Sequence, residues 1–196
     1  MKPTRMWFSS PYRKNIDMFA LRLQRYFSGG MALVACHLAL NLVHASPVLL
    51  PGVQPLPQQR LSIWGFDIYD ARLWVRPGFS MASYSAHAFV LELSYLRSLE
   101  GSAISKRSID EMRKVGAFSR DQENNWLKAM LDIFPNVQKG DRLQAVYGPT
   151  TGTEFLFNDK VIGRIQDPLF AQLFFGIWLH ESTTAPALRQ AWLKGL

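Results

Sequence analysis

The chain has 196 residues and a formal net charge of +7, from 22 Lys and Arg against 15 Asp and Glu. Six of the basic residues and one acid lie in residues 1–45, so the rest of the chain has 16 basic and 14 acidic residues, a net charge of +2. This balance gives no reason to expect nucleic-acid binding. Cys36 is the only cysteine, which excludes a disulfide and a thiolate metal site in residues 46–196.

A secretory signal peptide is predicted over residues 1–45. The basic residues precede an apolar run over residues 31–43, and small residues flank a cleavage site after Ala45. We therefore expect an exported protein, periplasmic or secreted, with no stable membrane span after cleavage. Two alternatives stay open: a membrane anchor, although crossing a bilayer takes about 20 apolar residues, and a lipoprotein processing site at Cys36. The start could also be Met18.

An extended arm is predicted over residues 46–59, which hold four prolines and show no hydrophobic period. From Arg60 an alternating pattern predicts one or two β-strands over residues 60–75, split near Gly65 and closed by a turn at residues 76–78. The alternation places Phe66, Ile68, Asp70 and Arg72 on one face and Asp67, Tyr69, Ala71 and Leu73 on the other.

A third strand is predicted over residues 87–96, and the period then lengthens to that of helices. A capping-box pattern at Ser108 marks the first helix, which could also begin near Ser102 and ends by Gly116. A second capping box opens a helix over residues 119–134.

The last part of the chain returns to strands and then to helices. Asn158-Asp159 predicts a tight turn between the last two strands. A helix over residues 169–179 follows Asp167-Pro168, a favourable N-cap and first position, and must be buried because nine of its eleven residues are apolar. A final helix begins at residues 184–186. Short strands are expected over residues 141–147, 153–157 and 160–165. Grouped strands and helices favour an α+β fold, an antiparallel sheet covered on one face.

The sequence has no recognised catalytic motif: no Gly-rich phosphate loop, no His-Glu-x-x-His and no Gly-x-Ser-x-Gly. We expect neither a cofactor nor a metal. His87 and His180 are solitary in the sequence, and Asp110-Glu111 is interpreted as the solvated first turn of a helix. The many aromatic residues could fill one core or, if the sheet and the buried helix part slightly, line an apolar cleft.

Candidate ligand-binding residues lie on or beside the predicted strands: Arg60, Tyr69, Arg72, Tyr95 and Arg97. A guanidinium at the mouth of an apolar cleft would hold a carboxylate or enolate oxygen through a charge-assisted fork, and a tyrosine hydroxyl would donate beside it. A surface role is the alternative for each arginine.

Several local motifs together resemble the chalcone isomerase-like family, most closely its secreted bacterial branch. The resemblance spans residues 60–196. The segments that carry it are Gly65–Trp74, Leu93–Arg97, Phe134–Asp141 and Phe174–Leu179, with Pro186 and Leu188-Arg189.

The resemblance implies an open-faced sandwich, a large antiparallel sheet under a layer of helices with a cleft between them. Plant enzymes of the family cyclise chalcones with an Arg that stabilises an enolate, and non-catalytic members bind fatty acids with an Arg and a Tyr. By this resemblance Arg60 would clamp a carboxylate and Tyr69 would be its hydrogen-bonding partner.

The departures from the plant enzymes argue against transferring their activity. Trp64 stands where they have a Thr, Arg107 and Lys114 stand where a helix supplies Tyr and Asn, and their late Thr has no clear counterpart at residues 176–177. We therefore expect non-catalytic binding of a hydrophobic anionic small molecule such as a fatty acid. The alternatives are an isomerase or intramolecular lyase acting on an enone, with Arg60 as electrophile, and an envelope scaffold.

Overall fold

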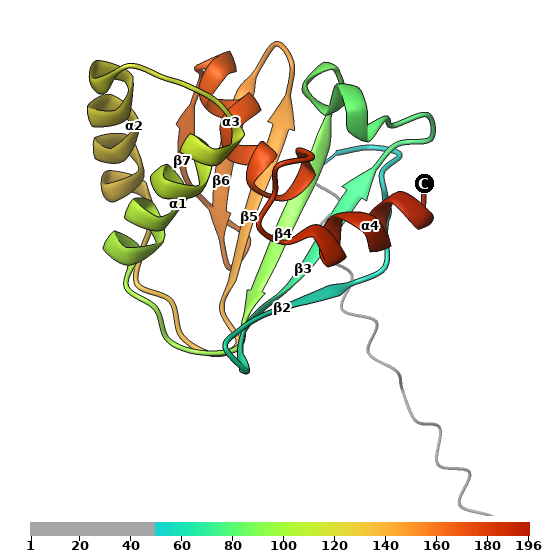
Figure 1. Ribbon diagram of the computed structural model, residues 1–196, viewed down its shortest axis with the longest axis horizontal. Coiled ribbons are helices and arrows are strands. Elements are labelled where there is room, and N and C mark those ends of the chain that lie inside the picture. Colours follow the sequence, from blue (N-terminus) through green and yellow to red (C-terminus); the bar gives the residue numbers. More distant parts are fainter. Residues whose placement is uncertain (1–49) are drawn as a thin grey trace, which may run out of the picture. The chain divides into compact units, whose positions relative to one another are not determined.

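The computed structural model describes residues 50–196; the predicted signal peptide and the first residues of the predicted arm lie outside them. Within these residues the strands form one seven-stranded antiparallel sheet in the order β1-β3-β4-β5-β6-β7, and β2 also pairs with β3 (Figure 1). The strands are β1 (Gln54–Pro55), β2 (Gln59–Ile63), β3 (Phe66–Val75), β4 (Phe89–Tyr95), β5 (Arg142–Gly148), β6 (Gly152–Phe157) and β7 (Lys160–Ile165).

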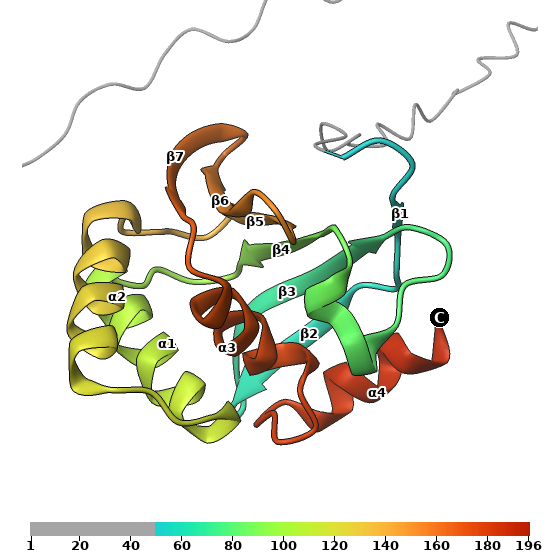
Figure 2. The same ribbon diagram turned by 90° about the horizontal axis from the view of Figure 1, so that it is seen from above.

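The helices lie together on one side of this sheet (Figure 2). They are the short 3₁₀ helix η1 (Met81–Ala86), α1 (Gly101–Val115), α2 (Arg120–Ile133), α3 (Pro168–Leu179) and α4 (Pro186–Lys194). The predicted α+β architecture, a large antiparallel sheet covered on one face by helices, is confirmed. No helix within residues 50–196 is long and apolar enough to cross a membrane.

The alternating pattern of β3 sets the two faces of the sheet. Tyr69, Ala71, Leu73 and Val75 are buried on the helix side, and the residues between them are more exposed. The helix-covered face is called the inner face below, and the opposite one the outer face. The arm residues next to the sheet are extended, since β1 pairs with β3 and the Pro57 carbonyl accepts a hydrogen bond from Trp192 of α4.

Capping chemistry fixes two of the helix starts. The Ser119 hydroxyl accepts from the Gln122 amide and the Gln122 side chain accepts from the Ser119 amide, which confirms the capping box of α2. Asp167 caps α3 by accepting from the amides of Leu169 and Phe170, as predicted.

The predicted capping box at Ser108 is wrong, because this residue lies inside α1. Its hydroxyl instead donates to the Ile104 carbonyl one turn earlier, an alternative that serine has within a helix. The helix begins at Gly101, whose amide donates to Asn136 Oδ1. A Cβ at Gly101 would lie 2.1 Å from the Phe134 carbonyl oxygen, so the close approach of the two loops requires glycine here.

The interface between the sheet and α3 is filled by aromatic rings. The ring centroid of Phe175 in α3 lies 4.7 Å from that of Phe89 and 5.4 Å from that of Tyr147, and the centroids of Phe174 and Phe155 are 5.5 Å apart. These side chains are almost fully buried. Of the two interpretations of the aromatic residues, a packed core therefore describes the rings between α3 and the sheet.

Candidate functional site

Arg60 and Tyr69 lie on opposite faces of the sheet, so the predicted clamp is wrong. Arg60 is paired in register with Asp70, and its guanidinium contacts Asp70 at 2.7 Å and Asp67 at 2.9 Å on the outer face. Leu61 is the residue that stands opposite Tyr69.

A β-bulge explains this outcome. Ile63 pairs with Phe66 and Ser62 with Asp67, but the register then shifts, and β3 has one extra residue before Tyr69. Without the shift Arg60 would stand opposite Tyr69 and share its face. Because successive side chains point to opposite faces, a slip of one residue moves Arg60 to the outer face. Asp67, predicted on the face of Tyr69, joins Arg60 for the same reason.

Two further candidate arginines also lie away from Tyr69. Arg72 donates to the Gln58 side chain at 2.8 Å and lies 5.7 Å from the ring of Trp74 on the outer face. The exposed guanidinium of Arg97 lies 5.3 Å from the ring of Phe66, at the end of the β2–β3 hairpin.

Tyr69 and Tyr95 come together on the inner face, with ring centroids 6.0 Å apart in an edge-to-face arrangement. The Tyr69 hydroxyl accepts a hydrogen bond of 2.9 Å from the indole N–H of Trp178. Burial raises the pKa of Tyr69, an increase that this hydrogen bond only partly offsets, and burial also raises the pKa of Tyr95. Among residues 50–196 the Tyr95 hydroxyl has no hydrogen-bond partner, so it is free to donate.

A charged group on α1 lies close to Tyr69 of this pair. One oxygen of the Glu111 carboxylate forms an ion pair with Arg107 at 2.5 Å and accepts a hydrogen bond from Lys114 at 2.9 Å, and the other oxygen accepts from the Thr184 hydroxyl at 2.8 Å. We call these four residues the Glu111 cluster. The charges of Glu111 and Arg107 both reach Tyr69, where they act in opposite directions on its pKa.

The Glu111 cluster has two cations for one carboxylate. Glu111 is only 5% exposed, whereas the Arg107 side chain is 60% exposed at the rim. Burial raises the pKa of Glu111, but the hydrogen bonds from Lys114 and Thr184 and the nearby positive charges outweigh it and hold the pKa below 4.5. Glu111 therefore stays ionised at neutral pH, and one positive charge of the cluster is left unbalanced.

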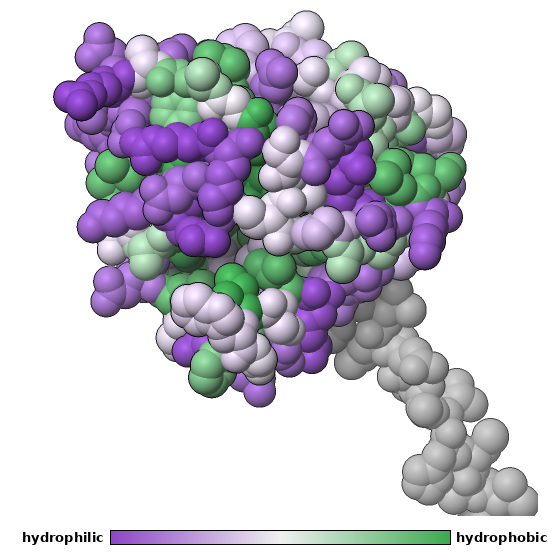
Figure 3. All heavy atoms as spheres, viewed as in Figure 1, coloured by the Kyte–Doolittle hydropathy of each residue, from purple (hydrophilic) through white to green (hydrophobic). Residues whose placement is uncertain are grey.

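The surface beside α1 combines charge with apolar side chains. Figure 3 shows a band of hydrophilic side chains over α1 and, below it toward the β2–β3 hairpin, a hollow in which hydrophobic side chains are visible. An amphipathic molecule could lie across this boundary with its polar end at α1.

The sequence interpretation missed most of this site. The sequence pattern predicts a solvated first turn at Glu111, but Glu111 is buried. It predicts for Thr184 only the start of the last helix, whereas its hydroxyl donates to Glu111. Arg107 and Lys114 stand out in the sequence only as departures from the plant enzymes. The available signal was the spacing of Arg107, Glu111 and Lys114, which places them on one side of a helix.

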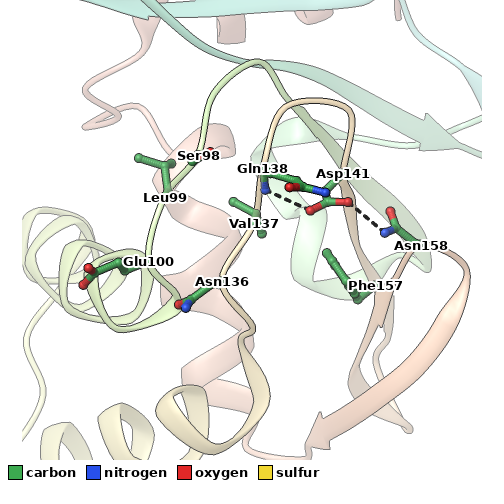
Figure 4. Close-up of a pocket in the computed structure, with 9 residues that line it drawn as sticks. All are labelled: Ser98, Leu99, Glu100, Asn136, Val137, Gln138, Asp141, Phe157 and Asn158. Carbon is green, nitrogen blue, oxygen red and sulfur yellow. Dashed lines mark hydrogen bonds between the residues drawn. The ribbon is translucent and has the colours of Figure 1, made fainter.

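A second hollow, the loop pocket, has a volume of about 810 Å³. Asp141 accepts from the Gln138 amide and from the Asn158 side chain, while the Glu100 carboxylate points away (Figure 4). These hydrogen bonds fasten neighbouring loops, so the polar groups already have structural partners. The pocket is lined by Ser98, Leu99, Glu100, Asn136, Val137, Gln138, Asp141, Phe157 and Asn158.

No group of three or more His, Cys, Asp or Glu side chains within residues 50–196 could hold a metal ion. Arg142, at the start of β5, pairs with Asp159 and Glu92.

The fold is a large antiparallel sheet covered on one face by helices, with Tyr69 and Tyr95 buried on the covered face. The family model described as chalcone isomerase-like matches residues 60–194, and the chain belongs to that family.

Two known proteins are similar to it. An uncharacterized protein of Haemophilus influenzae is 30% identical over 122 residues, which cover 62% of this chain and 58% of that relative's length. The crystal structure of a fatty-acid binding protein of Arabidopsis thaliana matches with a TM-score of 0.57 and 10% identity, covering 74% of this chain and 88% of that one. At this identity the second likeness shows the fold alone.

Proposed function

We propose that the chain binds a hydrophobic small molecule with an anionic head, such as a fatty acid, without turning it over. Arg107 and Lys114 hold the anion, and the hydroxyl of Tyr95 donates beside them. The observation that carries this proposal is the unbalanced positive charge of the Glu111 cluster close to the buried Tyr69, which packs edge-to-face against Tyr95. An anionic head would complete the charge balance that Glu111 only half supplies.

Glu111 acts in this proposal as an internal competitor. Its carboxylate occupies both cations and takes the Thr184 hydroxyl. A ligand carboxylate would share these donors or displace Glu111 from them. The apolar part of the ligand would lie in the hollow between α1 and the hairpin, since the space under α3 is filled.

The comparisons support a binding role. The chain shares a fold with a protein described as fatty-acid binding. Where the plant enzymes of the family have a Tyr and an Asn on a helix, this chain has two cations, which favour holding an anion over cyclising an enone.

Export is proposed on the sequence of residues 1–45 alone. A basic segment, an apolar run and small residues before Ser46 support a cleaved signal peptide and a location outside the cytoplasm, in the secreted bacterial branch of the family. Intact mass of the protein purified from its own cells tests this, because cleavage after Ala45 predicts a chain that begins at Ser46.

Native mass spectrometry of the same protein provides the first functional test. We expect an adduct with the mass of a lipid-sized acid, which disappears on denaturation. A protein without any adduct, which also fails to bind added palmitate after lipid extraction, would favour the scaffold interpretation.

Palmitate titration of charge variants provides the sharper test. Arg107→Gln is expected to weaken binding about tenfold, because a charge-assisted hydrogen bond is lost. Glu111→Gln is expected to strengthen it, because the internal competitor loses its charge. Lys106→Gln is the matched control. Lys106 is an exposed neighbour on α1, and this substitution removes the same positive charge outside the Glu111 cluster. If chalcone is consumed and Arg107→Gln abolishes that reaction, the enzyme alternative replaces the binding proposal.

A further inference from the structure

The β2–β3 hairpin ends in a tip of exposed apolar side chains. Trp64 is 95% exposed, Phe66 61% and Ile63 38%. The turn residues Trp64 and Gly65 have φ values of +51° and +80°, the combination that a two-residue hairpin turn of type I′ requires. Figure 1 shows this turn projecting at the end of the sheet, beside the loops that follow β4 and precede β5.

Trp64 is unfavourable for folding at this turn position, and no contact within residues 50–196 compensates for it. Asn, Asp and Gly are favoured in such turns, and a bulky residue with positive φ is a genuine outlier. At 95% exposure the indole also leaves its apolar surface in water. Strain of this kind persists where the residue serves a contact other than folding.

The size and shape of the tip favour a lipid surface over a protein. Three side chains offer roughly a few hundred Å² of apolar area, whereas a stable protein interface buries about 800 Å² on each partner. A projecting turn suits insertion, and Trp prefers the headgroup level of a bilayer because its ring is apolar with one polar N–H.

The charges around the tip fit the same partner. Arg97 is exposed beside Phe66 and has no acidic partner among the described residues, so it can reach a lipid phosphate. The nearest acid on the hairpin, Asp67, is already bound by Arg60 and Ser62. Repulsion from an anionic membrane is thereby reduced.

We infer that the β2–β3 hairpin binds the surface of a phospholipid bilayer, with Trp64 and Phe66 in the interfacial layer and Arg97 at the phosphates. The inference does not rest on the proposed ligand site. Because the tip lies at the same end of the sheet as the hollow beside α1, an amphipathic ligand could pass between membrane and protein there.

Flotation with large unilamellar vesicles of phosphatidylethanolamine and phosphatidylglycerol tests the inference. The full-length gene is expressed in its own cells and the protein is purified as the cells process it. The fraction that floats is expected to fall roughly fivefold or more for Trp64→Asn. The thermal midpoint of this variant should stay the same or rise, because Asn suits the turn. Val161→Thr, which removes another exposed apolar side chain, is expected to float like the wild type.

Further variants identify the partner. Arg97→Gln is expected to lower flotation more strongly with vesicles that contain phosphatidylglycerol than with vesicles of phosphatidylcholine, because both lipids offer a phosphate but only the first has a net negative charge. Arg107→Gln alters the proposed ligand site but keeps the hairpin, so this variant should float like the wild type. Membrane binding can therefore be confirmed even if the proposed ligand site is wrong. The inference is overturned if the wild type does not float, if Trp64→Asn floats as well, or if the wild type alone dimerises in sedimentation velocity without lipid.

Discussion

The two faces of β3 differ although they come from the same ten residues. On the inner face Tyr69, Ala71 and Leu73 are buried against the helices. On the outer face Asp70 and Arg72 pair with Arg60 and Gln58 and stay at least partly exposed. The outer face thus balances its charges between neighbouring strands, whereas the inner face receives its charges from α1.

This difference shows that the face decides what an arginine can do. Arg60 has two carboxylates around it, so its positive charge is already balanced and none is left for a ligand. Arg107 shares one carboxylate with Lys114 close to the buried Tyr69. The same residue type therefore serves sheet pairing on one face and, in our proposal, anion binding on the other.

The largest expected effect is the difference in free energy of unfolding between truncating a buried side chain on the inner face and truncating an exposed one on the outer face. Phe175→Ala should lower the free energy of unfolding by about 3–5 kcal/mol, because a fully buried ring between Phe89 and Tyr147 is lost and a cavity remains. Urea unfolding measures this. Val161 on β7 is 60% exposed, so Val161→Ala should change the free energy of unfolding by about 0.5 kcal/mol or less. Equal losses would show that α3 does not cover a packed core.

A smaller effect is expected from the two tyrosines of the inner face. Tyr69→Phe leaves the buried Trp178 N–H without an acceptor and should cost about 1–3 kcal/mol. Tyr95→Phe removes a hydroxyl that has no partner in residues 50–196, so it should cost clearly less while weakening palmitate binding. Urea unfolding and palmitate titration of both variants give the comparison, which fails if Tyr95→Phe destabilises the fold as much as Tyr69→Phe.

The Glu111 cluster should make stability depend on pH. Since the folded pKa of Glu111 lies below its ordinary value of 4.5, its contribution is present above that pH and is lost as the pH falls through the folded value. Thermal midpoints between pH 6 and pH 3 should therefore fall less in Glu111→Gln than in the wild type. Thr184→Val, which removes one donor, should lie between them. Parallel profiles for all three would mean that Glu111 is not held by the cluster.

Much of the fold followed from hydrophobic period and capping chemistry. The strands from Arg60 on, the turn at Asn158-Asp159 and the start of α3 at Asp167-Pro168 are all local features, and the structure has them where they were predicted. Local patterns suffice there because each element is fixed by its own residues. β1, Gln54–Pro55, was not predicted and lies in the expected arm.

The site depended on features that the sequence does not display. The bulge between β2 and β3 is a single register shift, and it alone moves Arg60 away from Tyr69. Thr184 reaches Glu111 across 73 positions of the chain, a contact that only the packing of the α3–α4 loop against α1 creates. Glu111 could not be recognised as buried until both partners were in place.

The smallest expected effect is the most decisive for the two faces. Arg60→Gln breaks the contacts with Asp67 and Asp70, yet palmitate affinity should stay at the wild-type level because the side chain points away from the inner face. Titrating it beside Arg107→Gln in one experiment removes differences in protein preparation. If Arg60→Gln instead weakens binding as strongly as Arg107→Gln, the ligand must contact the outer face, and the assignment of anion binding to α1 is wrong.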